Sequence, residues 1–195
     1  MKYLKTYEQN NEIPFQEWLK RNPQDINTTK INCSESNLID LNGIEKFKNL
    51  EKLYCYNNQL TELPDLSQLI NLEDLGCYNN QLTELPDISK NLKILYCSYN
   101  RLTELPDLSK LINLEELGCY NNQLTSLTDL GQLINLKYLY CHNNRLTELP
   151  DLSQCKNLKR LECYNNLLPY NDLKEYMVWH KKTYPWIYTA KKYNL

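Results

Sequence analysis

Apolar and polar positions repeat along most of this chain with a period of about 22 residues. Five consecutive segments begin with Leu-x-x-Leu-x-Cys-x-x-Asn, and they start at Leu50, Leu72, Leu92, Leu114 and Leu136. At the start of each segment, apolar residues alternate with variable residues, which is typical of a strand with one buried face. The sequence therefore predicts one short strand per segment.

The alternation also predicts which side chains point into the core. In residues 50–58 we expect Leu53 and Cys55 to point inward and Tyr54 and Tyr56 to point outward. One strand cannot bury its apolar face alone, so successive coils are expected to stack and share a core. A proline in the second half of most segments suits an irregular path better than a helix there.

The repeats divide the chain into three parts. Four of the five full segments have 22 residues and the second has 20. A degenerate copy precedes them at residues 28–49 and a partial copy follows at residues 158–169. We expect an N-terminal cap at residues 1–27, the repeats at residues 28–169, and a C-terminal cap helix and tail at residues 170–195.

The full pattern, L-x-x-L-x-C-x-x-N-x-L-T-x-L-P-D-L-S-x-L-x-N, resembles the leucine-rich repeat family and its short, internalin-like class. Cysteine at the sixth position is similar to repeats of bacterial and giant DNA virus proteins. The resemblance implies an α/β solenoid with a parallel β-sheet on its concave face and a mostly irregular or 3₁₀ convex side. It also implies a role in binding other proteins.

Outside the repeats, the sequence predicts a short helix at each end. Residues 14–21 begin with proline and place Phe15, Trp18 and Leu19 on one face. A second helix is expected from residue 171 or 172 to about residue 184. Its buried face is expected to contain Leu173, Tyr176, Met177 and His180. Residues 186–195 either fold back onto this cap or form a free arm that contacts an acidic partner.

Two residue types recur at fixed positions for structural reasons. Asparagine occupies the ninth position at Asn58, Asn80, Asn100, Asn122, Asn144 and Asn166, where a stacked amide can bond backbone groups. Cysteine occupies the inward sixth position at Cys33, Cys55, Cys77, Cys97, Cys119, Cys141 and Cys163. Parallel Cβ vectors give poor disulfide geometry, so we expect free thiols and a reducing, cytoplasmic compartment, in a host cell if the chain is an effector or viral protein.

The variable outward positions carry the candidate binding site. They form a tyrosine-rich surface, and tyrosine is enriched at interaction hot spots. The candidate partner-binding residues are Tyr54, Tyr56, Tyr78, Tyr96, Tyr99, Tyr120, Tyr138, Tyr140, His142, Arg160 and Tyr164. Tyrosine and glycine alternate in one column, which predicts shallow gaps between rings. The alternative is a structural role, since rings on neighbouring strands also stabilise a sheet.

Charge suggests an orientation for the partner. Residues 1–154 hold 14 basic and 21 acidic residues, whereas residues 155–195 hold 8 basic and 3 acidic residues. Such a dipolar surface can orient a partner at encounter. We expect a bound peptide or protein to place its acidic part near Arg160.

Other classes of function have little support. The chain has two histidines, and it lacks the phosphate-loop, dinucleotide, nucleophile-elbow and metalloprotease motifs. We therefore expect no enzyme activity and no cofactor or metal, although stacked acidic residues on the convex side leave cation binding as an alternative. The near-zero net charge disfavours nucleic acid, and no apolar stretch of membrane-span length or signal-peptide core occurs.

The leading hypothesis is a non-enzymatic module that binds a protein or peptide. A structural or self-assembling protein, and hence a homo-oligomer, is the alternative.

Overall fold

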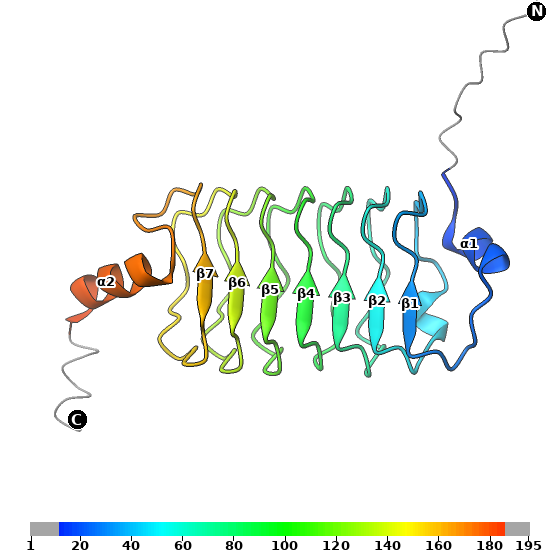
Figure 1. The fold of residues 1–195 in the computed structure, drawn as a ribbon, viewed down its shortest axis with the longest axis horizontal. Helices are drawn as coiled ribbons and strands as arrows, with labels where there is room; N and C mark the ends of the chain where they lie inside the picture. Colours follow the sequence, from blue (N-terminus) through cyan, green and yellow to red (C-terminus); the bar gives the residue numbers. More distant parts are fainter. Residues whose placement is uncertain (1–11, 186–195) are drawn as a thin grey trace, which may run out of the picture.

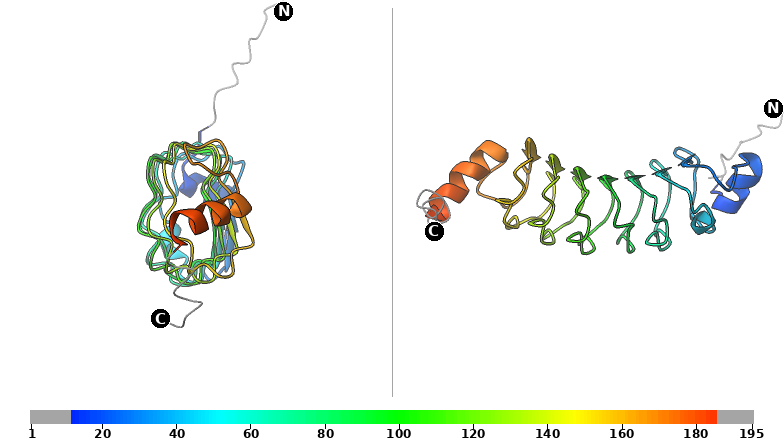
Figure 2. Two further views of the ribbon diagram at one scale, coloured as in Figure 1. Left: turned by 90° about the vertical axis from the view of Figure 1, so that its left-hand side faces the viewer. Right: turned by 90° about the horizontal axis from the view of Figure 1, so that it is seen from below.

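The computed structural model describes residues 12–185, which form a curved stack of coils (Figures 1 and 2). Seven parallel strands make one sheet in chain order, with the strands on the inner side of the curve. The strands are β1 (Lys30–Asn32), β2 (Lys52–Tyr54), β3 (Asp74–Gly76), β4 (Ile94–Tyr96), β5 (Glu116–Gly118), β6 (Tyr138–Tyr140) and β7 (Arg160–Glu162). The three helices are α1 (Phe15–Arg21), the 3₁₀ helix η1 (Ile44–Lys46) and α2 (Leu173–Thr183).

All strands pair in the same register, so equivalent positions of successive repeats are neighbours. Leu53 of β2 pairs with Leu75 of β3, which pairs with Leu95 of β4. These central leucines are fully buried, whereas Tyr54 beside Leu53 is partly exposed. The predicted inward and outward faces are therefore confirmed, and so is the solenoid architecture.

The sixth-position cysteines form a column inside the core. All eight cysteines of the chain are buried and unpaired. Burial raises the pKa of Cys33 to about 12 and that of Cys119 well above 9.0. The thiols thus act as small apolar side chains, as the sequence predicts.

The ninth-position asparagines tie neighbouring coils together. Asn122 Nδ2 donates to the carbonyl oxygens of Cys97 and Cys119 at 3.1 and 3.0 Å, and its Oδ1 accepts from the Leu102 amide at 3.0 Å. Asn80, Asn100, Asn144 and Asn166 make equivalent bonds. Each of these amides satisfies backbone groups that the short strands leave unpaired, which confirms the predicted ladder.

The convex side is irregular after the first coil. Within residues 12–185, η1 is the only regular helix on that side. Aspartates that follow the prolines hold tight turns, as where Asp65 Oδ1 accepts from the Ser67 amide at 2.8 Å. The acidic columns of this side, including Glu62 and Glu104, are exposed to solvent.

A helix closes each end of the stack. In α1, Phe15 and Trp18 are buried and their rings stack at 5.6 Å. Helix α2 lies across the last coil (Figure 2, left), and its N-cap Asp172 accepts a hydrogen bond from the Glu175 amide at 2.9 Å. These caps shield apolar side chains of the terminal coils, which would otherwise face water.

The expected buried face of α2 is wrong at one position. Tyr176 and His180 are buried, and Leu173 packs against the core, but Met177 is 47% exposed. Successive helical residues point about 100° apart, so the face that includes Tyr176 turns Met177 toward solvent. The two interpretations of residues 186–195, as part of the cap or as a free arm, fall outside the described residues.

Candidate functional site on the concave face

Three columns of outward side chains lie on the concave face: a third-position column that includes Glu116, Tyr138 and Arg160, and two columns that carry most of the rings. The fifth column consists of Tyr54, Gly76, Tyr96, Gly118, Tyr140 and Glu162. The seventh column consists of Tyr56, Tyr78, Ser98, Tyr120, His142 and Tyr164. The parallel register places the members of each column side by side on successive coils.

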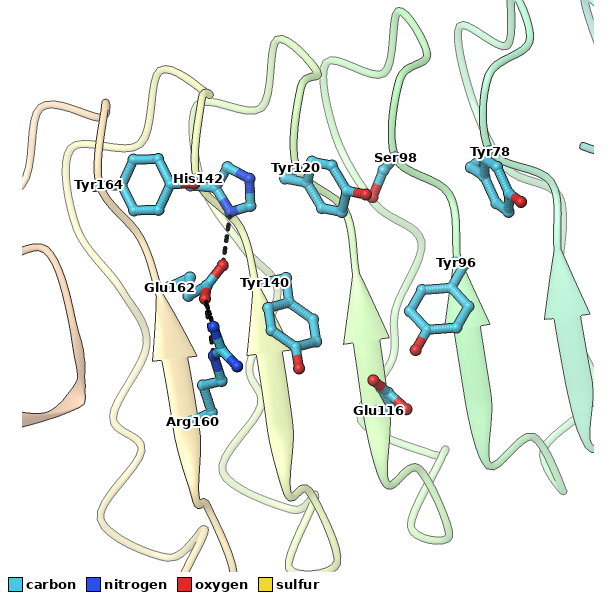
Figure 3. Close-up of a pocket in the computed structure, with 10 residues that line it drawn as sticks. All are labelled: Tyr78, Tyr96, Ser98, Glu116, Tyr120, Tyr140, His142, Arg160, Glu162 and Tyr164. Atoms are coloured by element: carbon cyan, nitrogen blue, oxygen red, sulfur yellow. Dashed lines mark hydrogen bonds and ion pairs between the residues drawn. The ribbon is translucent and has the colours of Figure 1, made fainter. Parts of the chain in front are cut away.

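The seventh column is a ladder of stacked rings with one interruption. Tyr56 and Tyr78 stack with ring centroids 4.5 Å apart. His142 stacks between Tyr120 and Tyr164, with both centroid distances 4.4 Å. Ser98 separates these two groups, as Figure 3 shows for the part of the column from Tyr78 to Tyr164. The missing ring leaves space between Tyr78 and Tyr120.

His142 is more enclosed than its outward position predicts. Its neighbours in the stack leave the residue only 8% exposed. Burial lowers the pKa of His142 below 6.5, and the nearby carboxylate of Glu162 opposes this shift. His142 Nδ1 lies 3.6 Å from Glu162 Oε2. The imidazole of His142 is therefore neutral at pH 7.

The glycines of the fifth column are covered by the tyrosine rings that precede them. A Cβ atom placed on Gly118 would lie 2.6 Å from Cδ1 of Tyr96, and one on Gly76 would lie 3.2 Å from Cδ1 of Tyr54. Each ring therefore leans over the glycine of the next coil and fills the space above it. The expected gaps therefore do not lie directly over the glycines, because the rings tilt along the sheet. The space between the Tyr96 and Tyr140 rings forms part of the pocket described below.

Carboxylates orient two of these tyrosines. The Tyr54 hydroxyl donates to Asp74 Oδ2 at 2.5 Å, and the Glu116 carboxylate lies beside the Tyr96 phenol in the equivalent place. Burial and then the neighbouring carboxylate raise the pKa of Tyr54 to about 12. The same two causes raise the pKa of Tyr96. Both phenols are thus held as neutral donors.

Arg160 is engaged at the C-terminal end of the face. Its Nε donates to Glu162 Oε1 at 2.8 Å, and its guanidinium lies 5.8 Å from the ring centroid of Tyr140. The guanidinium, whose side chain is 61% exposed, is thus paired with a carboxylate and a ring of the protein itself. An incoming acidic group would have to compete with Glu162.

A pocket of about 510 Å³ opens where the seventh column is interrupted (Figure 3). Its lining includes Tyr78, Tyr96, Tyr120, Tyr140, His142, Arg160 and Tyr164 from the candidate set. The other candidates lie outside the pocket lining. Tyr54 and Tyr56 are near the N-terminal end of the sheet. The ring of Tyr99 contacts that of Tyr120 edge-on, with centroids 5.3 Å apart, and the ring of Tyr138 stacks on that of Tyr140, with centroids 6.4 Å apart.

Three pocket residues were missing from the candidate set, namely Ser98, Glu116 and Glu162. Ser98 had a signal in the sequence, because this repeat reads Ser98-Tyr99 where the other regular repeats have an aromatic residue followed by asparagine. The eighth position adopts a left-handed backbone, with φ of 53° at Tyr99 and 53–55° at its asparagine equivalents. Asparagine tolerates this conformation better than tyrosine, so the exchange places a strained residue beside the pocket.

The described residues offer no site of at least three His, Cys, Asp or Glu side chains suited to hold a metal ion. Within residues 12–185, no helix is both long enough and apolar enough to cross a bilayer.

Comparison with known proteins identifies the architecture. The family described as leucine-rich repeats, in units of two copies, matches residues 48–90, 90–132 and 134–175. The chain belongs to the leucine-rich repeat family. Proteins of this family generally act as interaction scaffolds rather than as enzymes.

Solved bacterial structures share the fold. A leucine-rich repeat protein of Leptospira interrogans is 40% identical over 71% of our chain, with a TM-score of 0.63. YopM from Yersinia enterocolitica is 31% identical over 79%, with a TM-score of 0.67. YopM from Yersinia pestis, described as a leucine-rich effector protein, is 34% identical over 73%, with a TM-score of 0.58.

Our chain spans only 36% of the length of each of these three proteins. A search of curated proteins found no match.

Proposed function

We propose that this chain is a non-enzymatic interaction module that binds a protein or peptide on its concave face. The observation that supports this most is the pocket of about 510 Å³ in a surface made mainly of tyrosine rings. Tyrosine provides a large contact area with few torsions to restrict, and its hydroxyl keeps the ring compatible with water before binding. Concave faces of solenoids are extended binding surfaces in general.

The side-chain contacts favour binding over a purely structural role for part of this surface. Stacking alone would be served by an unbroken ladder of rings, but Ser98 breaks the ladder and Tyr99 takes up a strained backbone at the same coil. Backbone strain of this kind clusters at functional sites.

Affinity purification followed by direct measurement tests the proposal. Proteins captured by the wild-type chain would be purified, and their affinity measured by calorimetry against wild type and a Tyr96→Ala/Tyr140→Ala variant. We expect the double variant to bind at least about 30-fold more weakly, because each ring lost from a hot spot costs about 1–2 kcal/mol. Unchanged affinity for every purified partner would refute a site on the concave face.

A matched control separates loss of contacts from loss of folding. Tyr54→Ala removes a ring of the same column that lies outside the pocket lining. We expect this variant to retain most of the affinity of the wild type. Equal losses for Tyr54→Ala and the double variant would contradict a site centred on the pocket.

Self-association is a second candidate function, and exposed apolar residues favour it. Ile112 and Ile134 are 55% and 56% exposed on adjacent coils, and Val178 of α2 is 66% exposed. Light scattering coupled to size exclusion tests this alternative. A mass that stays at one chain as concentration rises would exclude it.

The same module is inferred to work in a reducing, cytoplasmic compartment, since its eight buried thiols are unpaired. Nucleic acid is a poor partner for this face, because acidic residues are interspersed with the rings. We also propose that the chain needs no cofactor and does not act at a membrane.

A further inference from the structure

The pocket at Ser98 has a chemical character that narrows the class of partner. It is walled by Tyr78 and Tyr96 on one side and by Tyr120 and Tyr140 on the other (Figure 3). Four phenol rings border this space, and the face of a phenol ring carries partial negative charge.

Charge in the pocket is unbalanced toward the acidic side. Two carboxylates, Glu116 and Glu162, line it against one cation, Arg160. Arg160 already pairs with Glu162, so their charges largely cancel. His142 is neutral at pH 7, because burial lowers its pKa. The carboxylate of Glu116, beside the phenol of Tyr96, is therefore left as the unbalanced charge.

The Ser98 side chain provides a further polar group in this pocket. Ser98 is 1% exposed, and its hydroxyl lies beside the Tyr120 phenol, whose pKa is raised by burial and, less strongly, by Tyr99, with Ser98 opposing the shift.

We propose that this pocket receives a cationic side chain, arginine or lysine, from a basic segment of the partner. Tyrosine faces and a carboxylate together are the recognition chemistry of such a cation. This inference rests on the proposed function, because it names the chemistry of the ligand for the same concave face. It also reverses the orientation expected from the sequence, in which an acidic part of the partner lies at Arg160.

The reason for that reversal is local. Overall charge rises toward the C-terminal end of the chain, but at the pocket itself Arg160 is neutralised by Glu162. The Arg160–Glu162 ion pair therefore affects the charge of the pocket more than the distant lysines do, because the electrostatic field of an exposed lysine is screened over about 8 Å at physiological ionic strength.

Defined small probes test the inference without a known partner. The affinity of N-acetyl-arginine amide would be measured by NMR titration and compared with that of its citrulline analogue, which has nearly the same shape and no charge. We expect arginine to bind about fivefold to tenfold more tightly, because the tyrosine rings supply a cation–π attraction and the Glu116 carboxylate supplies an ion pair. N-acetyl-glutamate amide is expected to bind more weakly than either. Equal binding of arginine and citrulline would overturn the proposal.

Two variants locate the effect. Ser98→Tyr/Tyr99→Asn restores the Tyr-Asn pair that most other repeats have, fills the pocket with a ring and should remove the preference for arginine. Glu116→Gln should reduce that preference to about twofold or less, by removing the charge. Glu104→Gln makes the same charge change at an exposed site outside the pocket lining and should leave the preference intact. A preference that survives both pocket variants would refute this site.

Failure of this inference is distinguishable from failure of the proposed function. A purified partner whose binding depends on Tyr96 and Tyr140 but not on Glu116 would leave the concave-face module standing and exclude the cation pocket. The opposite result would support both. In that case, replacing one arginine of the partner by citrulline, or one lysine by norleucine, weakens binding to the wild-type chain but not to the Glu116→Gln variant.

Discussion

The ring of Tyr96 lies against Gly118 of the next coil, so closely that a Cβ atom on Gly118 would be 2.6 Å from the ring. Glu116, two residues before that glycine, lies beside the Tyr96 phenol and, together with burial, raises the pKa of that group. Glycine at position 118 and glutamate at position 116 thus set the tilt of Tyr96 and, through it, one wall of the pocket. The equivalent contact of Tyr54 with Gly76 is looser, at 3.2 Å.

This difference predicts unequal effects of two identical substitutions. Gly118→Ala should destabilise the fold by about 1–2 kcal/mol, because the new methyl group must displace the Tyr96 ring. Gly76→Ala should lie within about 0.5 kcal/mol of wild type, since a small shift accommodates it and alanine reduces the entropy of the unfolded chain. Urea unfolding measures both, and equal stabilities would show that the ring moves freely.

The asparagine ladder predicts a large loss from one small change. Asn122→Ala removes the amide that bonds the carbonyls of Cys97 and Cys119 and the amide of Leu102. Leaving these backbone groups unpaired should cost about 2–4 kcal/mol in the free energy of unfolding. Thr125→Ala, at an exposed position of the same repeat, is the control and should cost less than about 0.5 kcal/mol. A loss below about 1 kcal/mol for Asn122→Ala would mean that water replaces the amide.

The buried thiols predict loss of stability in alkali. Their pKa is raised in the folded chain, to about 12 for Cys33 and Cys77, from 9.0 for an ordinary thiol. The unfolded chain therefore releases these protons first, so the stabilisation is complete below pH 9 and is lost as pH rises from about 9 toward 12.

Removing one thiol tests this linkage. Between pH 9 and pH 11, the free energy of unfolding of Cys119→Ala should fall less steeply with pH than that of wild type. The slopes should differ by about 1.4 kcal/mol per pH unit, because the variant lacks one ionising thiol. Urea unfolding at a series of pH values gives the two slopes. Parallel curves would show that Cys119 does not ionise preferentially in the unfolded chain.

His142 predicts a smaller effect in acid. Its pKa is lowered by burial between Tyr120 and Tyr164, so the unfolded chain takes up a proton first as pH falls through 6.5. Stability that depends on the neutral imidazole is present above pH 6.5 and is lost below it. NMR titration should give a pKa below 6.5 for His142 and a still lower value in Glu162→Gln, because Glu162 opposes the shift. A higher value in the variant would contradict this electrostatic account.

Much of the fold was predictable, because every repeat has the same pattern of apolar and variable positions. Alternation at the start of each unit defines the buried face, and seven near-copies require stacking to cover it. Less of the site was predictable. The candidate tyrosines do lie on the concave face, but alternation says nothing of how far a ring leans toward the next coil, and the Tyr54 and Tyr96 rings cover the glycines.

Pairing between coils was also hidden from the sequence. The sequence places His142 at an outward position and an acidic part of the partner near Arg160. The rings that enclose His142 lie on the two neighbouring coils, and the pairing of Arg160 with Glu162 of its own strand does not follow from alternation. The interruption at Ser98 was visible as a departure from the repeat, yet its meaning as the floor of a pocket depends on the rings of three neighbouring coils.

The amino-acid sequence by itself determined the solenoid, its inward thiols and amides, and the face on which the tyrosines stand, because these follow from periodicity that every repeat carries. Tertiary structure alone decided which rings stack, which glycine each ring covers and which charge remains unbalanced. Those outcomes depend on contacts of a few ångströms between side chains that are about 20 residues apart in the chain.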